Sequence, residues 1–413
     1  MLIQTNADRL WDDLMQTAML GKVKGNGLTR LAFDENDKKI RQWFEATCHN
    51  LGGSVRTDRV GNQFARFFST NDTQPTILVG SHLDTQPQGG RFDGILGVLA
   101  GIEVIRAFQE AHYKPGHAIE VINWTNEEGA RFSPPMMGSA YACGHLKLQD
   151  VLNATDRDSL TVGDISGGFR SENDVLDRIT ASAYLELHIE QGPVLEKAGK
   201  DIGIVTAITG VSWLTVTFHG RASHAGTTPL SYRNDSLIKA AKFIISFQDY
   251  LKRHSDKIIG TIGRIENAPN TPNTVPAETK IYIDLRSSDK KFFDNARNNI
   301  LTILTETLKF SEHDYQIAEL SKIDPTPFST DITDNIGQAA KKAGLSARTM
   351  ISGAGHDALQ LAKHMPTAMI FVPCKNGISH HVDETIDKIQ AKNGADVMAN
   401  TIIELDKRNG SPT

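Results

Sequence analysis

Cysteine is scarce in this chain, whose 413 residues include only Cys48, Cys143 and Cys374. An odd number of widely separated cysteines without a Cys-x-x-Cys pair offers neither a disulfide framework nor a cysteine-based structural zinc site. The first residues have no continuous apolar stretch, and Thr5–Leu20 mixes apolar and charged side chains at roughly helical spacing. We therefore expect an amphipathic surface helix there and a cytoplasmic protein.

Concentrated positive charge is also missing. The chain has 44 Lys and Arg residues against 49 Asp and Glu residues, a formal net charge of -5. Nucleic acids and anionic membranes bind clustered Lys and Arg, so neither is expected as a partner and a small molecule is the simpler expectation. The sequence also has no Gly-x-Ser-x-Gly nucleophile motif and no phosphate-binding Gly-Lys-Ser/Thr motif.

Strand-like and helical patterns alternate along much of the chain. Apolar runs lie at 76–79, 119–122, 184–187 and 368–372, and helical patterns at 95–109 and 354–363. This alternation predicts an α/β fold with a central, mostly parallel sheet flanked by helices.

The pattern changes between residues 211 and 327. Alternating runs at 214–218 and 280–285 and helical patterns at 236–252 and 290–309 suggest the order strand, helix, strand, strand, helix, strand. That order is typical of a small α+β unit with one solvated face. Because the chain is too long for one ordinary core, we expect a larger domain of residues 1–210 and 328–413 and an inserted domain of residues 211–327.

Polar side chains follow three of the apolar runs. His82 and Asp84 follow the first, Glu127 and Glu128 the second, and His188 the third. Open α/β sheets usually place their sites at strand ends, and histidine with carboxylate ligands favours zinc or a similar ion over magnesium. Two adjacent acids at a buried strand end are costly unless a cation or a shared proton compensates.

The neighbouring residues extend this metal hypothesis. Asp84 lies two residues after His82, on the same side of an extended chain, so Asp84 can orient the His82 imidazole. Asp93 lies between Gly90 and Gly94 and is a candidate ligand, although a carboxylate there also suits a helix start. Taken singly, each histidine or acid also fits a solvated strand end, a solvated turn or a satisfied core residue. Near the C-terminus, Gly377–His381 adds a fifth ligand.

Seven motifs occur along the chain in one order: Gly80-Ser-His-Leu-Asp84, Gly90-Arg-Phe-Asp-Gly94, Thr125-Asn-Glu-Glu-Gly129, Glu186-Leu-His-Ile-Glu-Gln-Gly-Pro193, Ser223-His-Ala-Gly-Thr-Thr-Pro229, Ser352-Gly-Ala-Gly-His-Asp-Ala358 and Gly377-Ile-Ser-His380. They resemble the aminoacylase-like family of two-metal peptidases and amidohydrolases, the peptidase M20 family. The likeness is greatest to the branch of N-carbamoyl-L-amino-acid hydrolases, β-ureidopropionases and allantoate amidohydrolases. It runs from about Leu28 to the C-terminal helix.

The resemblance implies two divalent metal ions per subunit that share Asp93. His82 and His188 would complete one site, and Glu128 and His380 would complete the other. Zinc is the expected ion, and manganese, cobalt and nickel also suit such ligands.

The resemblance also implies that Glu127 is the general base, which accepts a proton from the attacking water and returns it to the departing nitrogen. Family members often have a cis peptide bond after the shared aspartate, here Asp93–Gly94. This chain has His381 where relatives often have asparagine, so a swap of His380 for His381 as ligand stays open.

The insertion resembles the family's lid and dimerisation domain, which implies a homodimer. His224 matches a residue that stabilises the substrate carbonyl oxygen, and Asn273 and Arg286 match substrate-binding positions. Gln191 and Gly355 are expected to contact the same substrate. A guanidinium pairs with a carboxylate and an amide suits a urea-like group. From the residues alone, Arg286 equally fits a surface salt bridge, Asn273 a turn and His224 a solvated loop.

The residues predict a two-metal hydrolase of carbon-nitrogen bonds, and the resemblance implies hydrolysis of the carbamoyl C–N bond of N-carbamoyl-L-amino acids or ureidopropionate. The products would be the amino acid, ammonia and CO2, with Glu127 and His224 as catalytic residues. Allantoate is the alternative ureido substrate, and an aminopeptidase or carboxypeptidase activity is a further alternative. Outside enzymes, the alternative is a metal-binding or ligand-binding module without turnover.

Overall fold

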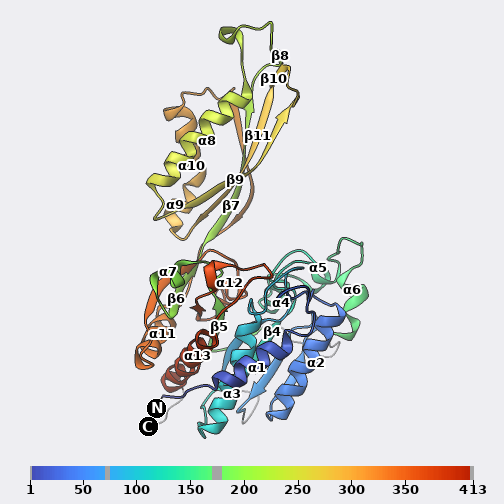
Figure 1. Ribbon diagram of the computed structural model, residues 1–413, viewed down its shortest axis with the longest axis vertical. Helices are drawn as coiled ribbons and strands as arrows, with labels where there is room; N and C mark the ends of the chain where they lie inside the picture. The colour runs from blue at the N-terminus through green and yellow to red at the C-terminus, as the bar shows by residue number, and fades with distance from the viewer. Residues whose placement is uncertain (1, 70–74, 170–178, 410–413) are drawn as a thin grey trace. The chain divides into compact units, whose positions relative to one another are not determined.

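The computed structural model describes residues 2–69, 75–169 and 179–409, with side chains described as far as residue 407 (Figure 1). Its contacts divide the chain into two compact units, Met1–Thr206 with Phe328–Thr413, and Ala207–Pro327. We call them unit 1 and unit 2 and describe each by itself. The first boundary lies four residues before the position expected from sequence, which was 210/211.

Within the described residues, a nine-stranded sheet has the order β1-β2-β4-β3-β5-β15-β6-β13, with β14 paired to β6, and its central strands lie in unit 1. The four central strands β4, β3, β5 and β15 are parallel, whereas β1, β2, β6 and β13 pair antiparallel. The predicted α/β class is confirmed, and the sheet is mixed because its edges reverse direction. The strands are β1 (Ser54–Thr57), β2 (Gln63–Phe67), β3 (Thr76–His82), β4 (Ala118–Trp124), β5 (Ala183–Ile189), β6 (Ile202–Ile208), β13 (Thr326–Pro327), β14 (Ala347–Ser352) and β15 (Thr367–Val372).

The central strands are buried at every residue, as parallel strands are when helices cover the sheet. Helix α3 packs on β3, β4 and β5, and α13 packs on α3, β5 and β15. None of the described helices is both long enough and apolar enough to cross a membrane. The helices of unit 1 are α1 (Ala7–Thr17), α2 (Glu35–Asn50), α3 (Ile95–Glu110), α4 (Met137–Ala142), α5 (Leu148–Leu152), α6 (Val162–Ile165), α7 (Val194–Ala198), α11 (Thr330–Lys342), α12 (Ala358–Leu361) and α13 (Lys388–Asn409).

Unit 2 contains an antiparallel sheet in the order β12-β7-β11-β9. Alternate residues of its central strands, such as Leu214 and Ile283, are buried in one cluster with Phe243 and Phe247 of α8. The other side chains of these strands point to the opposite face. The elements are β7 (Gly210–His219), β8 (Ser223–His224), α8 (Ser236–Arg253), β9 (Ile259–Ala268), β10 (Thr274–Val275), β11 (Glu278–Ser287), α9 (Lys290–Asp294), α10 (Ala296–Thr302), a π-helical turn (Ile303–Thr307) and β12 (Tyr315–Ile323).

Two predicted helices are shorter than expected. The pattern at 290–309 divides because Asn295 leaves the helical conformation between α9 and α10, and its side chain caps the Lys291 carbonyl. The pattern at 354–363 reduces to α12, because the Ser352 hydroxyl binds both the N–H and the carbonyl of Ala354 and holds a loop before the helix.

Candidate metal centre

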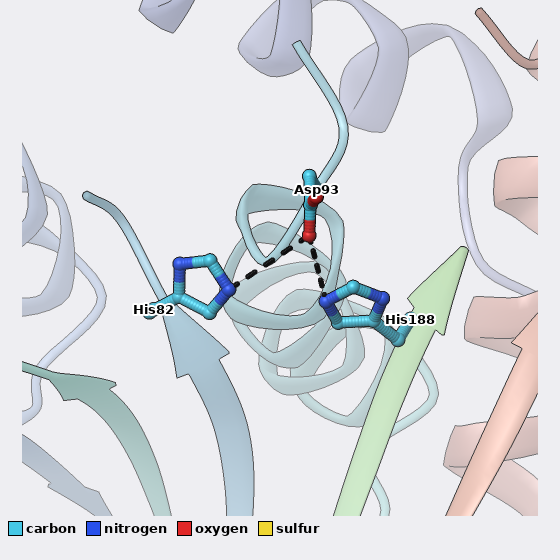
Figure 2. Close-up of side chains that lie close together, drawn as sticks. All are labelled: His82, Asp93 and His188. Carbon is cyan, nitrogen blue, oxygen red and sulfur yellow. Dashed lines mark ion pairs between the residues drawn. The ribbon is translucent and has the colours of Figure 1, made fainter. Parts of the chain in front are cut away.

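Three adjacent parallel strands of unit 1 place polar side chains at their carboxyl ends. His82 is the last residue of β3, Glu127 and Glu128 follow β4, and His188 is the next-to-last residue of β5. Asp93 reaches the same place from the loop between β3 and α3, so that it faces both histidines (Figure 2). Each strand ends where its apolar run ends. The apolar runs therefore determine where these polar side chains lie.

One oxygen of Asp93 faces the Nε2 atoms of two buried histidines. Asp93 Oδ1 lies 3.1 Å from His188 Nε2 and 3.9 Å from His82 Nε2 (Figure 2). The His82 Nδ1 lies 2.9 Å from the Asp84 main-chain carbonyl, and the His188 Nδ1 lies 2.9 Å from the Ile189 carbonyl. Because a carbonyl only accepts, each Nδ1 is protonated, so the Nε2 of each ring presents a lone pair when the ring is neutral.

These lone pairs fit a metal ion. The Gly94 N–H donates to His188 Nε2 at 3.1 Å, which likewise requires a lone pair on that atom. Nitrogen lone pairs that converge on a carboxylate oxygen repel it unless a cation lies between them. Imidazoles whose Nδ1–H is held by a hydrogen bond are typical of metal ligands. His82, Asp93 and His188 lie close enough together to hold one ion.

The other Asp93 oxygen faces a second group. Asp93 Oδ2 lies 3.2 Å from His380 Nε2, which is 3.5 Å from Glu128 Oε2. These three residues also lie close enough to hold an ion. His381 instead lies beside Asp383, 3.6 Å from Nδ1 to the carboxylate, so the structure brings His380 to Asp93.

A proton and a metal ion compete for these histidines. Burial lowers the pKa of His82 to about 4, so this ring is neutral at neutral pH. Burial also lowers the pKa of His188, but the contact with Asp93 outweighs it and raises the pKa to about 9. The same contact with Asp93 raises the pKa of His380 to about 9. Asp93 thus attracts positive charge to both of its oxygens.

The two acids after β4 lie in a crowded negative environment. Burial, and then the negative charge of Asp357, raises the pKa of Glu127 well above its ordinary value. Burial and the charge of Asp93 raise the pKa of Glu128 to about 8. Glu127 Oε2 lies 3.4 Å from His82 Nε2. A divalent cation would offset this excess of negative charge.

The loop that carries Asp93 requires glycine at position 94. Gly94 has a φ of 70°, and a Cβ there would lie 2.3 Å from the His82 ring. The expected cis bond at Asp93–Gly94 was wrong, because the cis bonds of the described residues are Ser133–Pro134 and Ala268–Pro269.

Asp84 supports both strand ends. The sequence predicted that Asp84 orients the His82 imidazole, and in the structure the main-chain carbonyl of Asp84 makes that contact. The Asp84 carboxylate lies 3.9 Å from the ring. Its two oxygens instead accept the N–H groups of Glu127 and Glu128, each at 3.2 Å, and fix the turn that presents these acids.

Three polar side chains around the centre escaped the sequence argument. The Ser379 hydroxyl lies 2.9 Å from Asp93 Oδ2 and 3.0 Å from Glu384 Oε2, within hydrogen-bond distance of both. Glu384 Oε1 also accepts the Asp93 N–H at 3.1 Å. Gln86 Nε2 donates to Glu128 Oε2 at 2.8 Å. Each of the three lies within four residues of a predicted site residue. Closeness to the motifs in sequence was therefore the one signal that could have identified them as part of the site.

The two substrate-binding residues predicted in unit 1, Gln191 and Gly355, lie in different loops. Gln191 Nε2 donates to Asp93 Oδ2 at 2.9 Å, so Gln191 adjoins the candidate metal centre. Gly355 lies in the loop between β14 and α12, where a Cβ would come within 3.3 Å of the Met136 side chain.

In unit 2, His224 and Asn273 lie together. His224 pairs with Thr274 across β8 and β10, and the Asn273 carbonyl accepts the Ala225 N–H at 3.0 Å. The His224 Nδ1 accepts the Gly226 N–H at 3.0 Å, so its Nε2 carries the proton of the neutral ring and is a donor.

Arg286 lies elsewhere in unit 2, near the end of β11 where it pairs with Val211. Its Nε and Nη2 donate to the two oxygens of Asp284, each at 3.1 Å. The surface salt bridge considered from sequence is therefore present. Such a half-buried pair at the protein surface contributes little to stability.

Comparisons with known proteins identify the family. Residues 78–404 match the model of peptidase family M20/M25/M40. N-carbamoyl-L-amino-acid amidohydrolase of Rhizobium meliloti is 36% identical over 403 residues, with 97% of each chain covered. Allantoate amidohydrolase of Escherichia coli strain K12 is 34% identical over 392 residues, which cover 93% of this chain and 94% of the relative. A hydantoinase/carbamoylase family amidase from Burkholderia ambifaria, solved as a crystal structure, has a TM-score of 0.91 at 35% identity, with 98% of both chains covered. The chain therefore belongs to peptidase family M20/M25/M40.

Proposed function

We propose that this chain hydrolyses the carbamoyl C–N bond of N-carbamoyl-L-amino acids or ureidopropionate and releases the amino acid, ammonia and CO2. The observation that carries the proposal is the convergence of the His82 and His188 lone pairs on Asp93. The names of the Rhizobium and Escherichia relatives support a ureido acid as substrate. Allantoate is the second candidate because one of these relatives is an allantoate amidohydrolase.

We propose two divalent ions per subunit. His82 and His188 would hold one with Asp93, and Glu128 and His380 would hold the other with the second Asp93 oxygen. The nitrogen and oxygen donors suit zinc, and manganese, cobalt and nickel are the alternatives. When bound, such ions polarise a carbonyl and lower the pKa of water.

Glu127 is the proposed proton carrier. Its raised pKa suits a carboxyl group that takes up a proton and then releases it. The contact of Glu127 Oε2 with His82 Nε2 at 3.4 Å supports this role, because it puts the carboxyl group beside a proposed metal ligand. Glu127 accepts a proton as water attacks the carbamoyl carbon and then donates it to the departing nitrogen.

The remaining roles fall to amide, imidazole and guanidinium donors. His224 donates through Nε2–H to the carbamoyl oxygen, and Arg286 binds the substrate carboxylate. Gln191 and Asn273 bind the ureido group, and the Gly355 backbone completes the substrate site. Unit 2 is the proposed lid and the dimerisation surface of a homodimer. A cytoplasmic location is part of the proposal because the cysteines are free thiols, which suits a reducing compartment.

A substrate panel tests this function. Metal-loaded full-length protein is assayed for ammonia release from N-carbamoyl-L-methionine, ureidopropionate, ureidoglycolate and allantoate, with metal content measured on the same sample. The proposal predicts turnover of at least one of the first two. Activity confined to allantoate or ureidoglycolate would overturn the substrate assignment. A metal-loaded protein that is inactive on all four would support a binding module without turnover.

A further inference from the structure

The face of the unit 2 sheet opposite α8 contains a hollow of about 530 Å³. Trp213, Tyr282, Asp284 and Arg286 line it, and in their strands they alternate with residues of the buried cluster that packs on α8. They therefore point away from α8. The volume of the hollow lies in the range of small-molecule sites.

Two β-bulges border this hollow. The pairing of β9 with β11 skips Gly263, and the pairing of β12 with β7 skips Leu320. Both residues line the hollow. A Cβ at Gly263 would meet no atom within 4 Å, so there is open space for a side chain at this position. Bulges at sheet edges often re-aim side chains beside functional sites.

The hollow has apolar walls beside the ion pair of Arg286 with Asp284. Trp213 is 50% exposed, Ile259 65% and Leu320 54%, which is unusual for side chains of this size that lie near one another. The Trp213 indole is held in place because its Nε1 donates to Asp284 Oδ2 at 3.0 Å. Asp284 in turn binds Arg286, so the aromatic wall and the guanidinium are fixed by one carboxylate.

We infer that this hollow accepts the side chain of the substrate, and that the enzyme prefers N-carbamoyl-L-amino acids with large apolar side chains. The inference rests on the proposed function, in which Arg286 binds the substrate carboxylate. In an α-ureido acid the carboxylate and the side chain branch from the same carbon, so a carboxylate on Arg286 brings the side chain to the walls that Arg286 adjoins. Ureidopropionate and N-carbamoylglycine have no such side chain, and allantoate carries a polar ureido group there.

Filling the hollow tests the inference. Gly263→Leu places a side chain in the open space. The measured quantity is the ratio of kcat/KM for N-carbamoyl-L-phenylalanine to that for N-carbamoylglycine, determined with metal-loaded full-length enzyme. The wild-type ratio is expected to be at least about 10, and Gly263→Leu should lower it by at least about tenfold. A ratio within about twofold of the wild-type value would overturn the inference.

A second variant removes the aromatic wall and covers the case in which Gly263→Leu does not fold. Trp213→Ala should raise KM for the phenylalanine derivative with little change in kcat, because the wall contacts a part of the substrate that does not react. The matched control is Ile245→Ala, an exposed apolar residue on α8 that is 65% exposed, and it should leave both substrates unaffected. Equal losses on both substrates in Trp213→Ala would refute the inference. Wild-type enzyme inactive on every ureido acid would refute the proposed function itself.

Discussion

Replacement of Glu127 by Gln removes the proposed proton carrier with almost no change in shape. Glu127 is buried and lies 3.4 Å from His82 Nε2, and the proposed metal ligands all remain in the variant. An amide cannot take up the proton that the carboxylate accepts. General acid–base catalysis contributes about 10²–10⁴-fold, so kcat should fall by that factor, which corresponds to about 3–5 kcal/mol of activation free energy.

The assay is steady-state ammonia release from N-carbamoyl-L-methionine, with metal content determined by elemental analysis of the same preparation. Glu45→Gln is the matched control, because the Glu45 side chain is 54% exposed on α2 and the same atoms change. We expect Glu127→Gln to keep its metal and lose turnover, and Glu45→Gln to keep both. A fully active Glu127→Gln enzyme with normal metal content would refute the assignment of the base.

Three further predictions concern the Asp93 loop, the metal and the C-terminal helix. Gly94→Ala forces a Cβ against the His82 ring at a positive φ, so it should abolish activity and lower the free energy of unfolding by about 1–2 kcal/mol in chemical denaturation. Removal of metal by a chelator should lower the melting temperature reversibly, because ions bind the folded state preferentially; an unchanged melting temperature would contradict this. Asp406→Asn weakens hydrogen bonds from Tyr113 and His117 and should cost about 2 kcal/mol at pH 7. Burial raises the pKa of Asp406, but these bonds outweigh it and hold the pKa below its ordinary value of 3.8, so their contribution is lost as the pH falls below that value. The difference in melting temperature between Asp406→Asn and wild type should therefore shrink at pH 3, and a constant difference would count against the assignment.

Much of the fold was predictable because its strongest signals are local. The apolar runs that became β3, β4, β5 and β15 are continuous, and such runs mark strands buried on both faces. The direction of the edge strands was not predictable, because β2 pairs with β4 and β6 with β15 across long stretches of chain. The two bulges of unit 2 depend on cross-strand register, which a single strand sequence does not encode.

The candidate site also contains some residues that the sequence could reveal and some contacts that it could not. His82, Glu127 and His188 could be found from sequence because each follows an apolar run that ends at the sheet edge. The contacts of Ser379 and Glu384 with Asp93 span nearly 300 residues of chain, so only the folded chain brings them together. The proton positions on the histidines likewise depend on main-chain carbonyl groups, which no side-chain pattern reveals.

The central claim is that the two oxygens of Asp93 serve two divalent ions. Its most direct test is the number of ions per chain in zinc-loaded, dialysed protein, measured by elemental analysis in wild type, Asp93→Ala and His381→Ala. The account predicts two ions in wild type and in His381→Ala, and loss of both sites in Asp93→Ala. A wild-type chain that binds at most one ion, or an Asp93→Ala chain that keeps two, would contradict it.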